Sequence, residues 1–372
     1  MQSRNFSLLI KPAGADCNLW CNYCFYRGKA ALYPPNTVHR MTDTVLEKLI
    51  SSYMKTKQDV YAFAWQGGEP TLMGLEFFQK LVRLQMQYGK PGITVSNALQ
   101  TNGFFISDKM AEFFSQYNFL LGVSLDGPEN LHDIFRRTSA GGGGSHKKIM
   151  KSLRCLSRKK TDFNILTLVS SGNVKNPDEV YSYFKDEGFF YQQYIPCVEW
   201  DAKGQALPWS ITGEEWGRFL LKIFERWYSH DIRRVSIRFF DSILHFIVNG
   251  QYNSCCMSDS CKQYFLVEYS GDVYPCDFFV HPDLKLGNIM QTGWEMFCES
   301  DVYNQFASRK KKWDLVCNNC DFLPYCGGDC IKHRPGEGSL GLSSLCDGWK
   351  LFYRETLPVF FELAKQKTLE TK

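Results

Sequence analysis

The stretch CNLWCNYC, residues 17–24, places Cys17, Cys21 and Cys24 within one short loop. It follows the apolar run FSLLI at residues 6–10. Three thiols so close together suit a redox pair with a third cysteine, a zinc site, or a metal centre with an open fourth position. A structural zinc ion needs four ligands, and no fourth cysteine or histidine follows closely in this loop. The spacing therefore favours a [4Fe–4S] cluster with one iron left free for a small-molecule ligand.

The chain is long enough for a large core and is nearly balanced in charge. Of its 372 residues 44% are hydrophobic, and 43 basic and 39 acidic residues give a formal net charge of +4. This small excess argues against nucleic acid or an anionic membrane surface as a partner. The basic run SRKKKWD (308–314) is interpreted as a solvated face. No apolar run approaches the roughly 20 residues that span a bilayer.

The compartment follows from the chain start and the cysteine content. The start MQSRNFSLLIKP has no apolar core of a signal peptide, so we expect a cytoplasmic protein. Its fifteen cysteines are unusual there, because cytosolic proteins rarely carry stable disulfides. An odd number also cannot pair completely within one chain. Thiolate ligation of metal accounts for them better.

The first 200 residues alternate between short β-rich runs and amphipathic helical patterns. The predicted strands are FSLLI (6–10), YAFAW (61–65), TVSNALQ (94–100), FLLGVSL (119–125), FNILTLV (163–169) and YQQYI (191–195). Helices are expected to start near Thr42, Leu75, Ser107, Ser145 and Pro177, with the Thr and Ser residues as N-caps. This order predicts parallel βα units. Six strands are too few to close an eightfold barrel, so we predict an open, partial (β/α)6 TIM-like barrel.

Polar motifs stand directly after the first four predicted strands. CNLWCNYC follows the first strand, QGGEP (66–70) the second, QTNG (100–103) the third and SLDG (124–127) the fourth. In parallel α/β sheets, ligand sites gather at the carboxyl ends of the strands. The four motifs are therefore expected to line one site.

The last third of the chain has a different character. A helical stretch over about 212–248 precedes a region, from Cys255 onward, that is dense in cysteine and poor in regular patterns. An amphipathic helix returns at 348–366. The predicted domains are a barrel at 1–235, a cysteine-rich domain at 236–347 and a C-terminal helix at 348–372.

The C-x3-C-x2-C array, with the aromatic Tyr23 before the last cysteine and GGEP after the second strand, resembles the radical S-adenosylmethionine (SAM) superfamily. In that family the free iron is chelated by the amino and carboxylate groups of SAM. Electron transfer from the cluster then yields methionine and a 5′-deoxyadenosyl radical. The resemblance implies an oxidoreductase that uses SAM and an iron–sulfur cluster held by Cys17, Cys21 and Cys24.

The same resemblance implies the SAM pocket. Glycines in GGEP allow close backbone approach, and Glu69 is expected to pair with the SAM ammonium. The candidates for SAM binding are Tyr23, Gly67, Gly68, Glu69, Ser124, Arg136 and Val198. Ordinary alternatives are a tight turn for the glycines, a helix cap for Ser124 and a surface residue for Arg136.

The remaining cysteines resemble the SPASM domain, a C-terminal extension of peptide-modifying radical SAM enzymes that holds two auxiliary [4Fe–4S] clusters. By itself, C-x2-C-x5-C-x3-C (317–330) also fits a zinc knuckle. The resemblance implies interleaved ligand sets, Cys255, Cys261, Cys276 and Cys330 for one cluster and Cys317, Cys320, Cys326 and Cys346 for the other. Cys256 adjoins Cys255 and is the alternative ligand. Cys155, Cys197, Cys256 and Cys298 remain as expected buried thiols.

A longer run of matches narrows the family. CNYCFY, FAWQGGEPTLMGLEFF, LQTNG, SLDGP, VSIRFFD and GDVYPCDFF resemble the anaerobic sulfatase-maturating enzymes over nearly the whole chain. This resemblance implies oxidation of a cysteine or serine in a C/S-x-P-x-R segment of an unfolded sulfatase to Cα-formylglycine. It implies Asp277 as the general base, with a turn cap as the alternative role. Gln66 and Tyr26 are candidate substrate contacts, and a ferredoxin or flavodoxin is the expected electron donor.

Three other interpretations stay open at this stage. A SPASM enzyme that forms a thioether or carbon–carbon crosslink in a ribosomal peptide precursor would share every cluster motif. Such enzymes often carry an extra N-terminal recognition module, for which a first strand at 6–10 leaves no room. An electron carrier would need no SAM pocket, and a zinc scaffold would contain no iron.

Overall fold

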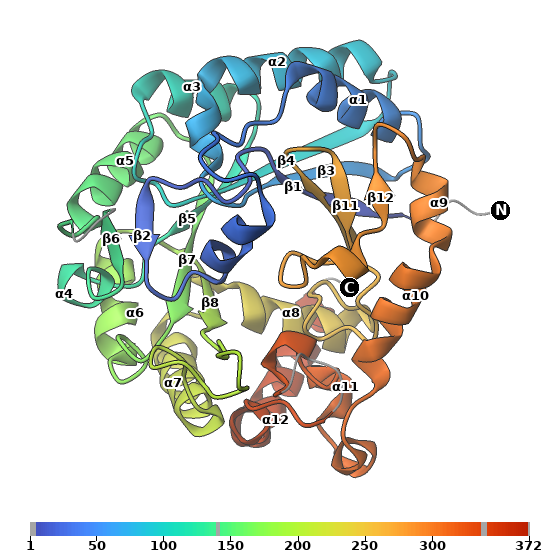
Figure 1. The fold of residues 1–372 in the computed structure, drawn as a ribbon. Helices are drawn as coiled ribbons and strands as arrows, with labels where there is room; N and C mark the ends of the chain where they lie inside the picture. The colour runs from blue at the N-terminus through green and yellow to red at the C-terminus, as the bar shows by residue number, and fades with distance from the viewer. Residues whose placement is uncertain (1–4, 139–141, 336–340, 371–372) are drawn as a thin grey trace. The chain divides into compact units, whose positions relative to one another are not determined.

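The computed structural model describes residues 5–138, 142–335 and 341–370 (Figure 1). The chain divides into two compact units. The first comprises residues 1–124, 137–163 and 262–307, and the second comprises 125–136, 164–261 and 308–372. Within the described ranges, no helix is both long enough and apolar enough to cross a membrane.

The first unit contains a mainly parallel sheet. Its strands are β1 (Ser7–Lys11), β3 (Val60–Trp65), β4 (Thr94–Thr101), β5 (Leu120–Ser124), β10 (Tyr264–Glu268), β11 (Asp272–Tyr274) and β12 (Gly287–Asn288). They lie in the order β12-β11-β10-β1-β3-β4-β5. β1 pairs in parallel with both β3 and β10, whereas β11 and β12 add antiparallel pairs. The first four predicted strands are confirmed, but β10 comes from the cysteine-rich region and was not predicted.

Helices cover the outer side of this sheet. α1 (Asp43–Tyr53), α2 (Gly74–Tyr88), α3 (Asp108–Gln116) and α5 (His146–Arg158) follow one another around it (Figure 1). Thr42 and Ser107 accept capping hydrogen bonds, as predicted. Ser145 occupies the N-cap position of α5, as predicted, but its backbone is already helical and its side chain makes no capping bond. α9 (Trp294–Glu299) and α10 (Asp301–Ser308) follow β12.

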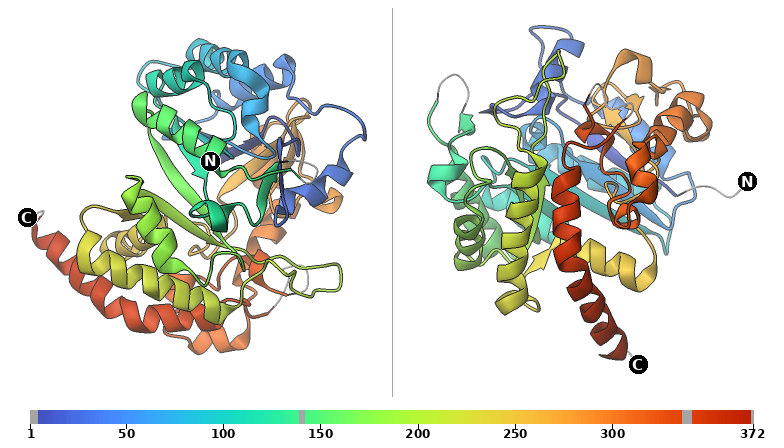
Figure 2. Two further views of the ribbon diagram at one scale, coloured as in Figure 1. Left: turned by 90° about the vertical axis from the view of Figure 1, so that its left-hand side faces the viewer. Right: turned by 90° about the horizontal axis from the view of Figure 1, so that it is seen from below.

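The second unit carries three further parallel strands, β7 (Phe163–Val169), β8 (Tyr191–Pro196) and β9 (Ser236–Ile237). Its longer helices are α6 (Pro177–Asp186), α7 (Gly213–Arg226), α8 (Arg238–Asn249) and α12 (Cys346–Glu370). The expected helical stretch at 212–248 is therefore interrupted, because a π turn (Trp227–Asp231) and β9 separate α7 from α8. α12 packs along α7 and α8, and Figure 2 shows α12 and α7 side by side.

Short elements connect and complete the two units. They are β2 (Leu19–Cys21), β6 (Arg136–Thr138), α4 (Glu129–His132), α11 (Leu323–Cys326) and the 3-10 turns Phe25–Leu32, Pro70–Met73, Pro282–Leu284, Arg309–Lys311, Leu315–Asn319 and Ile331–His333. The interpretation of SRKKKWD as a solvated face was wrong at its centre. Lys311 and Lys312 are exposed, but Lys310 is 0% exposed.

Candidate active site and metal centres

The cysteine loop after β1 meets the motif after β4. The thiol of Cys17 accepts hydrogen bonds from the Leu19 amide at 3.4 Å and from Asn102 Nδ2 at 3.5 Å. Asn102 also donates to Asn18 Oδ1 at 2.8 Å. Burial, followed by the charge of Glu69, raises the pKa of Cys17 to about 12. A free thiol here is thus protonated at neutral pH, and metal binding must displace its proton.

The glycine turn after β3 lies against the same loop. Gly68 adopts φ +45°, and a Cβ at this position would lie 2.1 Å from the carbonyl oxygen of Asp16. The Glu69 amide donates to that same carbonyl at 2.8 Å. Gly67 has φ +87°, and its missing Cβ leaves room for the Lys11 side chain. The two glycines therefore permit close backbone approach, as predicted.

Glu69 is fully buried beneath this turn. Its Oε1 accepts hydrogen bonds from Thr71 and from Thr101 Oγ1, the latter at 2.7 Å. Its Oε2 accepts one hydrogen bond, from the backbone amide of Asn102 at 2.7 Å. That oxygen can still accept a further hydrogen bond. Burial raises the pKa of Glu69, although these hydrogen bonds oppose the shift. The site thus combines a buried carboxyl group, three motif loops and the Cys17 thiol.

Asp277 is buried next to Cys276 and is held by three side chains. Gln66 Nε2 donates to its Oδ2 at 3.0 Å, and Tyr264 OH donates to its Oδ1 at 3.0 Å. The ammonium of Lys11, itself 2% exposed, lies 3.6 Å from Oδ2. The Asp277 carboxylate therefore faces one cation and two neutral donors contributed by β1, β10 and the loop after β3.

Lys11 belongs to a second buried polar group. Its ammonium lies 4.2 Å from the centroid of the Tyr26 ring. The Tyr26 hydroxyl donates to Glu268 Oε1, and the Tyr33 hydroxyl donates to Glu268 Oε2 at 2.8 Å. Burial and the charge of Glu268 raise the pKa of Tyr26. The Tyr26 hydroxyl therefore stays protonated and donates to Glu268. Its contact with the substrate remains a prediction.

The other predicted SAM contacts fall in both units. In the first, Ser124 ends β5 and accepts a hydrogen bond from Gln100 Nε2 at 3.1 Å. In the second, Arg136 Nε donates to Asp126 Oδ2 at 3.0 Å, and the pair is buried. Val198 follows β8 and is also buried. Arg136 is thus not a surface residue, and the SAM contacts of all three remain predictions.

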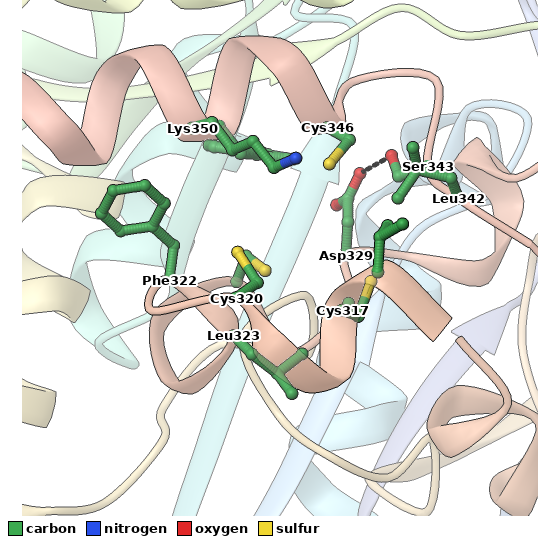
Figure 3. Close-up of a pocket in the computed structure, with 13 residues that line it drawn as sticks. Cys317, Cys320, Phe322, Leu323, Asp329, Leu342, Ser343, Cys346 and Lys350 are labelled. Carbon is green, nitrogen blue, oxygen red and sulfur yellow. Dashed lines mark hydrogen bonds between the residues drawn. The ribbon is translucent and has the colours of Figure 1, made fainter. Parts of the chain in front are cut away.

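Four cysteines of the second unit line one pocket. Cys317, Cys320, Cys326 and Cys346 form its walls together with Asp329 and Lys350. Figure 3 shows the labelled thiols of Cys317, Cys320 and Cys346 turned toward a common space. Burial raises the pKa of Cys326 to about 12 and that of Cys346 to about 11, and the neighbouring thiols add to both shifts. The four-thiol donor set fits an iron–sulfur cluster after rearrangement of the side chains, because no described group of residues is preformed around a metal ion.

The other predicted ligand set draws on both units. Cys255, Cys261 and Cys330 belong to the second unit, and the thiols of Cys330 and Cys261 contribute to a raised pKa of Cys255. Cys276 belongs to the first unit, where Tyr264 OH donates to its Sγ at 3.3 Å. Cys256 also acts on Cys255, so the choice of Cys255 over Cys256 as the ligand stays a prediction.

The four cysteines outside the three predicted ligand sets differ in burial. Cys155 and Cys197 are buried, as expected. Cys256 and Cys298 are partly exposed, so their predicted burial was wrong.

Sequence reasoning missed Lys11, Tyr264 and Glu268. Each lies on β1 or β10, and these strands pair in parallel although more than two hundred residues separate them along the chain. A lysine at the end of the apolar run SLLIK was the one local signal. Lys11 becomes a neighbour of Asp277 only because β1 pairs with β10. No local sequence pattern reveals that pairing.

Comparison with known proteins now identifies the family. Residues 12–183 match the model of the radical SAM superfamily, and residues 255–321 match that of an iron–sulfur cluster-binding domain, SPASM. The chain is 35% identical to the serine-type anaerobic sulfatase-maturating enzyme of Bacteroides thetaiotaomicron, with 96% of this chain and 91% of the relative covered. It belongs to the anaerobic sulfatase-maturating enzymes.

Further relatives of this family agree. The cysteine-type anaerobic sulfatase-maturating enzyme of Clostridium perfringens is 35% identical, with 96% of this chain and 98% of the relative covered. A solved structure of native anSMEcpe with bound AdoMet and Cp18Cys peptide superposes with a TM-score of 0.90 at 35% identity, covering 98% of this chain and 100% of that one. These findings confirm the predicted fold class and a radical SAM oxidoreductase that uses SAM and iron–sulfur clusters.

Proposed function

We propose that this sulfatase-maturating enzyme oxidises a cysteine or serine in a C/S-x-P-x-R segment of an unfolded sulfatase to Cα-formylglycine. The observation that carries the proposal is the buried Asp277 carboxylate, held by Gln66, Tyr264 and Lys11 beside Cys276. Relatives of both the serine type and the cysteine type are 35% identical to this chain. Both peptide types are therefore proposed as substrates.

Three [4Fe–4S] clusters are part of the proposal. Cys17, Cys21 and Cys24 would hold the first, which together with SAM supplies the 5′-deoxyadenosyl radical. The second set is Cys255, Cys261, Cys276 and Cys330, and the third is Cys317, Cys320, Cys326 and Cys346. The pocket lined by all four members of the third set supports its assignment. Glu69 would receive the SAM ammonium on its Oε2.

Asp277 would take the proton from the substrate thiol or hydroxyl. The Lys11 ammonium lies 3.6 Å from Asp277 Oδ2 and helps to hold the carboxyl group in place. Gln66 and Tyr264 donate to the two carboxylate oxygens and fix their orientation. The substrate hydroxyl or thiol would then approach a carboxylate whose position is set before binding.

The domain limits, partners and compartment complete the proposal. We assign residues 1–235 to the radical SAM barrel, 236–347 to the SPASM domain and 348–372 to the C-terminal helix. A low-potential donor such as a ferredoxin or flavodoxin would reduce the clusters in the cytoplasm. No nucleic acid or membrane is required.

The Asp277→Asn variant tests the base. We expect formylglycine formation to fall about 100-fold or more, since proton transfer by a positioned side chain contributes about that much. SAM cleavage to 5′-deoxyadenosine should continue. Mass spectrometry of a C-x-P-x-R peptide and of 5′-deoxyadenosine in the same anaerobic reaction separates the two effects. Unchanged formylglycine formation in the variant would reject Asp277 as the base.

The alternative, a peptide crosslinking enzyme, shares the fold. SuiB bound to precursor peptide SuiA superposes with a TM-score of 0.66 at 16% identity, a likeness that concerns the fold alone. A crosslinking enzyme would leave both sulfatase peptides without formylglycine while still cleaving SAM.

A further inference from the structure

Two basic side chains of the second unit are buried without an ion pair to any residue that the structure describes. Lys310 and Arg334 are each 0% exposed. Within the described ranges neither lies within 4.0 Å of a carboxylate, whereas the adjacent, exposed Lys311 pairs with Asp259 at 2.8 Å. Burying an uncompensated charge costs several kcal/mol, so these two cations require a source of negative charge.

Backbone carbonyls are the direct partners of both cations. The Lys310 ammonium donates to the Cys256 carbonyl at 2.9 Å and also to the Asp329 carbonyl. The Arg334 guanidinium donates to the carbonyls of Arg309, Lys312, Lys310 and Gly328 at 2.9 to 3.2 Å. Its Nε has no hydrogen-bond partner among the residues that the structure describes. Carbonyl dipoles reduce the desolvation penalty of a cation but do not neutralise it.

The local backbone is shaped to present these carbonyls. Gly327, Gly328 and Asp329 have φ values of +53°, +69° and +59° and form a left-handed turn between Cys326 and Cys330. A Cβ at Gly327 would lie 2.4 Å from the Met257 carbonyl oxygen, so the turn packs tightly on the segment after Cys256. The turn thereby joins the cations to two cysteine-bearing segments.

Asp329, whose carbonyl binds Lys310, also carries a buried carboxylate. Its Oδ2 accepts hydrogen bonds from His333 Nδ1 at 2.9 Å and from Ser343 Oγ at 2.6 Å. Its buried Oδ1 has no hydrogen-bond partner among the described residues. One carboxylate with a histidine partner does not balance two basic side chains.

Both cations bind backbone segments that carry cysteines of the proposed auxiliary ligand sets. Lys310 donates to the carbonyl of Cys256, next to Cys255. It also donates to that of Asp329, next to Cys330. Arg334 donates to the carbonyl of Gly328, which also lines the pocket of the other four cysteines. The cations thus lie within electrostatic reach of thiols from both proposed auxiliary ligand sets. As thiolates around iron, these sulfurs would supply the missing negative charge.

We propose that Lys310 and Arg334 are buried counter-cations that raise the reduction potentials of the auxiliary clusters. A reduced cluster carries one more negative charge than an oxidised one, so a nearby cation stabilises the reduced form more. Auxiliary clusters with raised potentials accept an electron from a strongly reducing substrate radical more readily. This inference rests on the proposed ligand sets, but not on the identity of the peptide.

The test is a potentiometric titration of the full-length chain. The background variant carries Cys17→Ala, Cys21→Ala and Cys24→Ala, so that only auxiliary clusters titrate and no SAM chemistry contributes. Lys310→Met and Arg334→Gln remove one charge each, whereas Lys310→Arg and Arg334→Lys keep it. Lys312→Met, at an exposed position of the same basic run, is the matched control. Iron content and the EPR signal at each potential are measured for every variant.

We expect the potentials to shift to more negative values in Lys310→Met and Arg334→Gln and to stay unchanged in Lys312→Met. Unchanged potentials in both neutral variants at full iron content would overturn the proposal. If Lys310→Met and Arg334→Gln lose iron, a full iron content in Lys310→Arg and Arg334→Lys would support the proposal, because the auxiliary clusters would then require the positive charge. Loss of iron from the charge-conserving variants as well would overturn it in favour of a structural role. If the neutral variants show the expected shifts in reduction potential but neither sulfatase peptide is converted to formylglycine, the proposed peptide substrate is rejected and the role of the two cations stands.

Discussion

At the scale of single residues, the site depends on two buried carboxyl groups in contrasting surroundings. Asp277 faces the Lys11 ammonium, whereas Glu69 is surrounded by neutral donors from Thr71, Thr101 and Asn102. Burial without a cation opposes ionisation, and it raises the pKa of Glu69. Glu69 is therefore suited to bind a ligand that brings its own positive charge, whereas Asp277 already has a cation beside it.

The raised pKa of Glu69 gives a prediction on SAM affinity. Because burial raises this pKa above 4.5, the carboxyl group gains its proton at a higher pH than an ordinary glutamate does. The pairing with the SAM ammonium should therefore weaken as the pH falls from about 7.5 toward the raised pKa. We expect Glu69→Gln to bind SAM about tenfold more weakly at neutral pH, with a flatter pH dependence. Anaerobic equilibrium dialysis with labelled SAM measures both; equal pH profiles for the two proteins would contradict the pairing.

At the scale of elements, tight turns bring the ligand-bearing segments together. The GGEP turn packs on the cysteine loop through Gly68, and the left-handed turn at 327–329 packs on the segment after Cys256 through Gly327. In both places a Cβ would meet backbone atoms rather than a movable side chain. The position of the predicted metal ligands is thus set by backbone contacts that only glycine allows.

Gly68→Ala tests the first of these contacts. Its Cβ would lie 2.1 Å from the Asp16 carbonyl oxygen, so the cysteine loop must move. Gly92→Ala is the matched control, because Gly92 also has a positive φ, +84°, but nothing lies within 4 Å of its Cβ position. We expect Gly92→Ala to cost roughly 1 kcal/mol from backbone strain. Gly68→Ala should cost more and also lose iron from the first cluster.

The melting temperature and the iron content of Gly68→Ala and Gly92→Ala test this prediction. Similar melting temperatures and equal iron contents would show that the contact between the GGEP turn and the cysteine loop does not control the cluster site.

At the scale of the whole molecule, what could be predicted depended on the distance along the chain between interacting residues. The cysteine spacing, the six predicted strands (β1, β3, β4, β5, β7 and β8) and the motif positions are local signals, and the structure or the family comparison confirmed them. The neighbours of Asp277 depend on pairing of β1 with β10, and the burial of Lys310 depends on contacts with the turn at 327–329. Sequence patterns within one element carry no information on either.

The number of clusters is a prediction at this scale. Three [4Fe–4S] clusters require eleven cysteines, Cys17, Cys21, Cys24, Cys255, Cys261, Cys276, Cys317, Cys320, Cys326, Cys330 and Cys346. The variant with Cys17, Cys21 and Cys24 replaced by alanine should keep about two thirds of the iron. Replacing Cys155 instead should leave the iron unchanged. An iron content near one half of that of the unaltered enzyme in the triple variant would show that only one auxiliary cluster is present.

The most direct test of the central claim follows one hydrogen atom. Peptides containing C-x-P-x-R and S-x-P-x-R are prepared with deuterium on the target Cβ and incubated anaerobically with the reconstituted enzyme, SAM and a low-potential reductant. The account predicts that deuterium appears in 5′-deoxyadenosine in step with formylglycine in the peptide. Abundant 5′-deoxyadenosine without deuterium, together with an unchanged peptide, would contradict it.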